Sequence, residues 1–359
     1  MKKSSLLLLA APALLLCGCG DGSSLDSNGV PQPSGGETVS LAQGANKLAS
    51  AAKGTVAENA FGFSLSIPSF STSVTSDHMS LSTSLAKATA SFAVSGYSGT
   101  SIADLKAAFT AGFDSFNFSA SMDTGMSEMP TSTSSLSVGK SRIGAYLSNG
   151  GLYVDISDST LHEAIVSAVI GDQSVDASLI SASIPGKVML PDAIAAEDLP
   201  LIDLSEFNQQ AASFASSLAA NASSLDPFFT LKDYEDGTST LYGEFTVETL
   251  ASLTAAIEGV GDSSFDASAA VSSMLAQAGD AKLNFSFSLS YDASHILGLA
   301  LGEDVSVKAN VSQGGETSEA QIVSKGSFDL DFVYGQDANV SLPDDLSEYV
   351  PMTSSPASK

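Results

Sequence analysis

The sequence predicts an α+β fold: a large curved antiparallel sheet, half-barrel-like and built of sequential hairpins, with several amphipathic helices packed on its concave face. Phenylalanine and serine alternate in several runs, which is the period-two pattern of strands with one buried face. Two further pairs of runs, in which other apolar residues alternate, are joined by the turn dipeptides Asn149–Gly150 and Asp236–Gly237. Stretches between the runs have apolar residues three and four positions apart, which is typical of helices.

The chain before the first hairpin mixes these two patterns. A weak helical spacing predicts a short helix over 39 to 52, and alternation predicts strands at 61 to 67 and 92 to 94. Residues 101 to 104 have the spacing of a capping box, so a second helix is expected from there to Gly112.

Alternation returns at 116 to 122, and a Ser/Thr/Met-rich loop is expected over 123 to 138. The first hairpin then covers 143 to 156 and turns at Asn149–Gly150. A helix capped by Asp158 is expected to end at Gly171.

The second half of the chain opens with a less regular region, 172 to 202, which predicts a loop with short strands. The most regular apolar stripe predicts a helix over 203 to 218, and the second hairpin follows at 229 to 245. Two more helices are expected at 247 to 258 and 265 to 278. The closing strands are expected at 283 to 291, 296 to 301, 305 to 311, 328 to 334 and 340 to 342.

The beginning of the chain predicts a bacterial lipoprotein signal peptide over residues 1 to 18. Lys2 and Lys3 precede a short apolar run, and Leu16-Cys17-Gly18-Cys19 resembles a lipobox. Processing at this motif would place a diacylglyceryl group on Cys19 and cut just before it. The alternative is a soluble secreted protein that is cut nearby.

The rest of the chain divides by composition. Residues 19 to 37 are rich in Gly, Ser, Asp, Asn and Pro, which predicts a lipidated cysteine followed by a flexible tether. Residues 38 to 349 are expected to form one α+β domain, or two similar halves, and 350 to 359 a disordered tail. The expected location is the extracytoplasmic side of a bacterial cell membrane or outer membrane, where the lipid provides the attachment.

The net charge and the arrangement of histidine, serine and lysine residues argue against nucleic-acid binding, metal binding and catalysis. The formal net charge of −26 argues against nucleic acid and anionic headgroups as partners. His78, His162 and His295 lie in different predicted elements without metal-ligand spacing, so neither a metal nor another cofactor is expected. Ser-x-x-Lys occurs at 50 to 53 and 84 to 87 without a Lys-Thr-Gly motif, and the serine-rich composition explains such matches. The protein is therefore not expected to be an enzyme.

Three stretches resemble the LolA/LppX–LprG family of lipid-carrier lipoproteins: 145 to 155, 232 to 237 and 343 to 349. The stretches consist of two hairpins and a closing turn. In that family a strongly curved antiparallel sheet wraps helices, and the apolar space between them holds acyl chains. The resemblance therefore implies a carrier of lipids rather than a catalyst.

The leading functional hypothesis is that the protein binds a lipid or other apolar ligand at the membrane surface. The side chains expected to line the site come from the closing strands and the 203 to 218 helix: Phe207, Phe214, Phe285, Phe287, Leu289, Phe328, Leu330 and Phe332. The same residues could instead pack together as an ordinary core. The alternative function is a surface structural or interaction lipoprotein that binds a protein or cell-wall partner through its sheet face.

Overall fold

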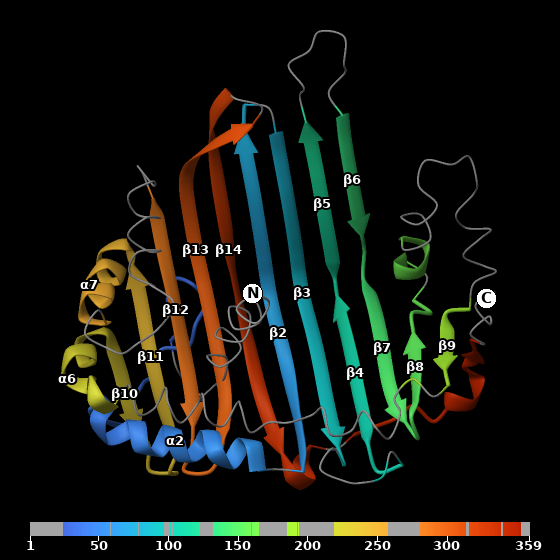
Figure 1. Ribbon diagram of the computed structural model, residues 1–359, viewed down its shortest axis with the longest axis horizontal. Coiled ribbons are helices and arrows are strands. Elements are labelled where there is room, and N and C mark those ends of the chain that lie inside the picture. The colour runs from blue at the N-terminus through green and yellow to red at the C-terminus, as the bar shows by residue number, and fades with distance from the viewer. Residues whose placement is uncertain are drawn as a thin grey trace, which may run out of the picture.

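The protein forms one large open sheet, and most of its described helices lie at one end of it, as the computed structural model shows (Figure 1). The sheet is antiparallel apart from the parallel pairing of β15 with β9. Its path begins at β1 and ends at β15, so the described strands do not close into a barrel. The structure describes residues 24–57, 59–77, 79–96, 101, 103–122, 132–158, 160–164, 185–191, 193, 219–257, 281–313, 316–338 and 340–352.

The strands follow one another in space as β1-β10-β11-β12-β13-β14-β2-β3-β4-β7-β8-β9-β15, and β5 and β6 continue from β3. Their bounds are β1 Glu37–Thr38, β2 Ala60–Ser76, β3 Met79–Ser95, β4 Lys106–Phe113, β5 Ser115–Met122, β6 Ser132–Val138, β7 Ser141–Ser148, β8 Gly151–Asp155, β9 Lys187–Leu190, β10 Phe229–Asp233, β11 Ser239–Thr246, β12 Lys282–Tyr291, β13 Ile296–Gln313, β14 Glu316–Tyr334 and β15 Val350–Pro351. The described helices include α2 Leu41–Ala57, α6 Ala222–Leu225 and α7 Val247–Ile257.

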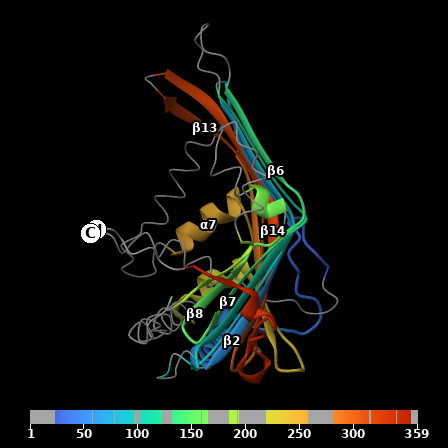
Figure 2. The same ribbon diagram turned by 90° about the vertical axis from the view of Figure 1, so that its right-hand side faces the viewer.

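The sheet bends along a row of irregularities, which lie in β2 and β3 and where β4 is followed by β5 and β6 by β7 (Figure 2). The register shifts between β14 and β2 next to Pro68, and Lys87 in β3 has a φ of 47°. Asp114 separates β4 from β5, and Gly139–Lys140 separates β6 from β7. Compared with β14, each of these strands or strand pairs contains one extra residue at the bend. The alternation of apolar residues is therefore displaced by one position in the sequence after the bend, and the apolar side chains stay on the same face of the sheet.

As a result, the sheet has one apolar and one polar face over its whole length. Val74 pairs with Leu81 and Ile322 beyond the bend, on the face that carries Leu65 and Leu330 before it. The opposite face is made mainly of Ser, Thr and Asn side chains, because these residues occupy the intervening positions.

The main core lies where α2 and α6 cover the apolar face of β10 to β14. Leu41, Leu48 and Leu225 of the helices pack against strand residues such as Leu289 and Leu299, all nearly inaccessible to solvent. The helices bury the apolar side of these strands, and the core stabilises this end of the sheet.

Residues 24 to 36 pack on the polar face of the same strands, which corrects the prediction that they belong to a flexible tether. The Asp26 carboxylate accepts hydrogen bonds from the backbone amides of Asn28 (2.8 Å) and Val30 (2.9 Å), which form a local turn. Val30 is fully buried with Tyr242 and Ala300, and the Asn28 side-chain amide donates to the Ser286 hydroxyl over 3.0 Å. Burial of one apolar side chain and these hydrogen bonds order a segment whose composition is typical of linkers.

Many predicted elements are confirmed. Helices 39 to 52 and 247 to 258 correspond to α2 and α7, and the two hairpins are β7–β8 and β10–β11. Asn149 and Gly150 both have positive φ angles, as a two-residue hairpin turn requires.

Other predicted elements are wrong. The predicted helix ending at Gly112 is instead strand β4, because its alanine-rich sequence also alternates and pairs with β3. The predicted loop at 123 to 138 contains strand β6, which pairs with β5. The predicted strands 296 to 301 and 305 to 311 merge into β13, and no strand is described at 340 to 342.

Candidate functional site

The predicted ligand-lining residues of the sheet belong to the packed core or its border. Phe287, Leu289 and Leu330 are 5%, 2% and 8% exposed, and Phe328 and Phe332 pack against the same cluster. Phe285 is 37% exposed, at the border between the core and the bend. Cys19, Phe207 and Phe214 lie outside the described residues.

The aromatic rings of this core fill the space around Phe287. The ring of Phe245 stacks on Phe287 with centroids 6.1 Å apart, and Phe229 meets the same ring edge-on at 6.0 Å. These contacts are those of an ordinary core, the alternative that the sequence left open.

Beyond the bend, many large side chains of the apolar face remain partly exposed to solvent, and we call this part the open region. Met122, Leu136 and Ile322 are 45%, 37% and 37% exposed, and none of the other members is buried. The open region consists of Phe70, Val74, Leu81, Leu85, Phe116, Phe118, Met122, Leu136, Val305, Val307 and Ile322.

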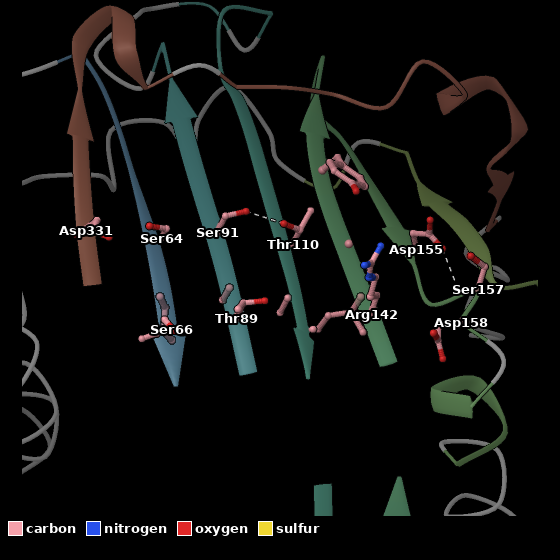
Figure 3. Close-up of a pocket in the computed structure, with 17 residues that line it drawn as sticks. Ser64, Ser66, Thr89, Ser91, Thr110, Arg142, Asp155, Ser157, Asp158 and Asp331 are labelled. Carbon is pink, nitrogen blue, oxygen red and sulfur yellow. Dashed lines mark hydrogen bonds between the residues drawn. The ribbon is translucent and has the colours of Figure 1, made fainter. Parts of the chain in front are cut away.

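The polar face carries a hollow of about 840 Å³, which we call the polar trough (Figure 3). It crosses β14, β2, β3, β4, β7 and β8 along a row of direct cross-strand partners. The row reads Asp331, Ser64, Ser91, Thr110, Gly144 and Asp155. Arg142, Tyr146 and Asp158 also line the trough.

Hydroxyl groups occupy the middle of the trough and carboxylates its two ends. The Ser91 and Thr110 hydroxyls lie 2.6 Å apart and share a hydrogen bond. Asp155 at one end accepts a hydrogen bond from the Ser157 backbone amide over 2.9 Å. Desolvation, followed by the neighbouring charge of Asp329, raises the pKa of Asp331 at the other end, although Ser64 donates a hydrogen bond to it.

Tyr146 lies along the surface of the sheet because its neighbour on the same face is glycine. A β-carbon on Gly144 would lie only 2.6 Å from the Tyr146 hydroxyl oxygen and 2.9 Å from two ring carbons. The ring therefore occupies the space above Gly144 and forms part of the trough wall. Desolvation and then the charge of Asp155 raise the pKa of the Tyr146 hydroxyl, which is therefore neutral at physiological pH.

A second hollow of about 520 Å³ adjoins the trough and shares Ser64, Ser91, Thr110, Tyr146 and Asp331 with it. Its far wall is the segment that follows β14, including Asp337 and residues 341 to 343. The segment after β14 therefore borders the second hollow, and the shared residues join this hollow to the trough.

Sequence reasoning missed the trough. Its side chains come from six strands that are far apart along the chain, and serine at alternate positions predicts only a solvent-facing side of a strand. Only the register of the sheet places these hydroxyls in one row.

The described residues also bear on membrane-spanning helices and on metal sites. None of the described helices is both long and apolar enough to span a membrane. Nor does any group of three or more His, Cys, Asp and Glu residues in this part of the chain have an arrangement that could hold a metal ion.

Comparisons with known proteins identify no family for this chain. No protein-family model matches it, and no curated protein does. A crystal structure of a beta-barrel-like protein of a domain of unknown function from Brucella abortus is similar over 76% of this chain and 98% of its own, at 10% identity. Its TM-score is 0.14, so the likeness carries no argument about fold or function.

Proposed function

We propose that this protein is a non-catalytic extracytoplasmic lipoprotein, anchored through Cys19, that binds a lipid or other apolar ligand on the apolar face of its sheet. The observation that supports the ligand is the open region, where Met122, Leu136 and Ile322 are 37% to 45% exposed and the other large apolar side chains are half-buried. Contiguous exposed apolar surface of this kind marks ligand, partner or membrane binding in soluble domains.

The ligand is placed in the open region and not among the lining residues that the sequence predicts. Phe287, Leu289 and Leu330 already bury their surface against protein, so a ligand could reach them only by displacing the core. Phe285 borders the open region and remains accessible. In this arrangement the site extends from the bend along the concave face, and the helices on that face close the end of the site next to the core.

Native mass spectrometry with lipid extraction tests this function. A chain starting at Gly20 retains every described residue and would be purified from cells, sprayed intact and then extracted with organic solvent. We expect an added mass that leaves on denaturation and extracts as lipid. An apo mass that takes up no added phospholipid would contradict the proposal.

A pair of matched variants locates the ligand. Phe118 pairs directly with Leu136 on the apolar face, and Ser119 pairs with Ser135 on the opposite face. Phe118→Asn with Leu136→Asn is expected to remove the bound lipid, whereas Ser119→Asn with Ser135→Asn should retain it. Equal retention in both variants would exclude the open region as the site.

A further inference from the structure

We propose that the polar trough is a binding site for a neutral oligosaccharide that lies across the strands. This site is on the face opposite to the apolar ligand and does not depend on the function proposed above. The trough and the adjoining hollow have volumes of about 840 and 520 Å³, the size range of small-ligand sites.

The length of the trough fits an extended ligand. The row from Asp331 to Asp155 crosses six strands, and five interstrand spacings amount to about 24 Å. Its floor is regular sheet, and Figure 3 shows Ser64, Ser91 and Thr110 side by side on successive strands. A rigid floor of this kind positions hydrogen-bonding groups at a fixed repeat.

The chemistry of the lining fits groups that both donate and accept hydrogen bonds. Each Ser or Thr hydroxyl can do both, carboxylates accept two hydrogen bonds side by side, and Arg142 donates. Sugar hydroxyls have the same dual capacity. The Tyr146 ring lies along the sheet beside them and offers an apolar surface for the C–H side of a sugar ring.

Charge and composition argue against other ligands. Asp155, Asp158 and Asp331 face a single cation in the trough, Arg142, so an acidic polymer would be repelled. A protein partner usually anchors through buried apolar and aromatic side chains, and the trough offers one aromatic ring among hydroxyls.

Isothermal titration calorimetry with defined hexasaccharides tests the site. The chain starting at Gly20 would be titrated with cellohexaose, mannohexaose and chitohexaose, and with hexagalacturonic acid as the acidic comparison. We expect at least one neutral hexasaccharide to bind and the acidic one not to bind. Absence of binding by all three neutral probes, or tighter binding of the acidic probe, would overturn the proposal.

Variants then assign the binding to the trough. Tyr146→Ala is expected to lower the affinity for the neutral hexasaccharide about tenfold. Tyr146→Phe is expected to retain most of that affinity because the ring remains. Ser91→Ala with Thr110→Ala removes the central hydroxyls from exposed positions, which leaves folding intact and should also weaken binding.

The matched control is a second hydroxyl pair on the same face. Ser82 and Ser119 lie 2.8 Å apart beyond the bend, away from Tyr146 and the three trough carboxylates. Ser82→Ala with Ser119→Ala should leave the affinity unchanged. An equal loss in this control and in the Ser91/Thr110 variant would show that the trough is not the site.

Discussion

The sheet has two contrasting regions built from the same alternation of serine and apolar residues. In the strands under α2, Leu289 and Leu299 are 2% and 0% exposed, and even Ser286 and Ser288 on the other face are 0% and 1% exposed. In the open region, Leu136 is 37% exposed. Helices cover one face of the first region and residues 24 to 36 cover the other, whereas Met122 and Ile322 on the apolar face of the second remain 45% and 37% exposed. Alternation therefore determines which face is apolar, and the segments packed on it determine whether that face is a core or a surface.

The largest expected effect comes from comparing one leucine in each region. Leu289→Ala should lower the free energy of unfolding by about 3 kcal/mol, because it opens a cavity in a packed core. Leu136→Ala should cost less than about 1 kcal/mol, because its side chain is largely hydrated already. Urea denaturation of both variants measures the difference. Similar costs would mean that the open region is covered as tightly as the core.

A smaller effect is expected from the segment on the polar face. Val30→Ala removes two buried methyl groups and should cost about 1.5 kcal/mol. Leu25→Ala in the same segment is the control, because Leu25 is 65% exposed and should be neutral. Guanidinium denaturation distinguishes the two. If Val30→Ala behaves like Leu25→Ala, residues 24 to 36 act as the flexible tether that the composition predicts.

The bend offers a stabilising change. Lys87 has a φ of 47°, a conformation that favours glycine, so Lys87→Gly should raise the free energy of unfolding by up to about 1 kcal/mol. The lost ion pair with Asp114 is exposed and contributes little. Thermal unfolding gives the sign, with Asp114→Asn as the control for the ion pair. If Lys87→Gly lowers the melting temperature and Asp114→Asn leaves it unchanged, the backbone at position 87 is not strained.

The smallest effect is a pH dependence at the far edge of the sheet. A hydrogen bond from Lys187 lowers the pKa of Asp345, so this carboxylate stabilises the fold above the ordinary Asp pKa of about 3.9. That contribution should disappear as the pH falls through the lowered pKa in the folded state. Melting temperatures measured between about pH 5 and pH 2 should therefore fall less in Lys187→Met than in the natural chain. Parallel profiles would contradict the role of this pair.

Local signals predicted the parts of the fold that depend on short stretches of chain. The turn at Asn149–Gly150 and the alternation around it were enough to predict β7 and β8. The same reasoning failed for β4, where alanine fits both the helical and the strand period, and only pairing with β3 decides. It also failed for residues 24 to 36, whose order depends on a surface formed by distant strands.

The candidate sites depend still more on long-range register. The apolar positions of the open region were partly recognised as strand faces, as at Phe116 and Phe118, but their exposure depends on what packs against them. The bend that keeps them on one face needs one extra residue in β2, in β3 and in the continuous runs β4–β5 and β6–β7, and no single stretch of sequence shows that these extra residues align.

The central claim is that the open region, and not the polar face, holds the apolar ligand. The only cysteines are Cys17 and Cys19, so a chain starting at Gly20 accepts a single label at Leu136→Cys or, on the opposite face, at Ser135→Cys. Each variant would carry an environment-sensitive fluorophore and be titrated with dihexanoylphosphatidylcholine below its micelle concentration. We predict a saturable blue shift in emission at position 136 and no shift at 135. No shift at 136, or the same shift at both positions, would contradict the account.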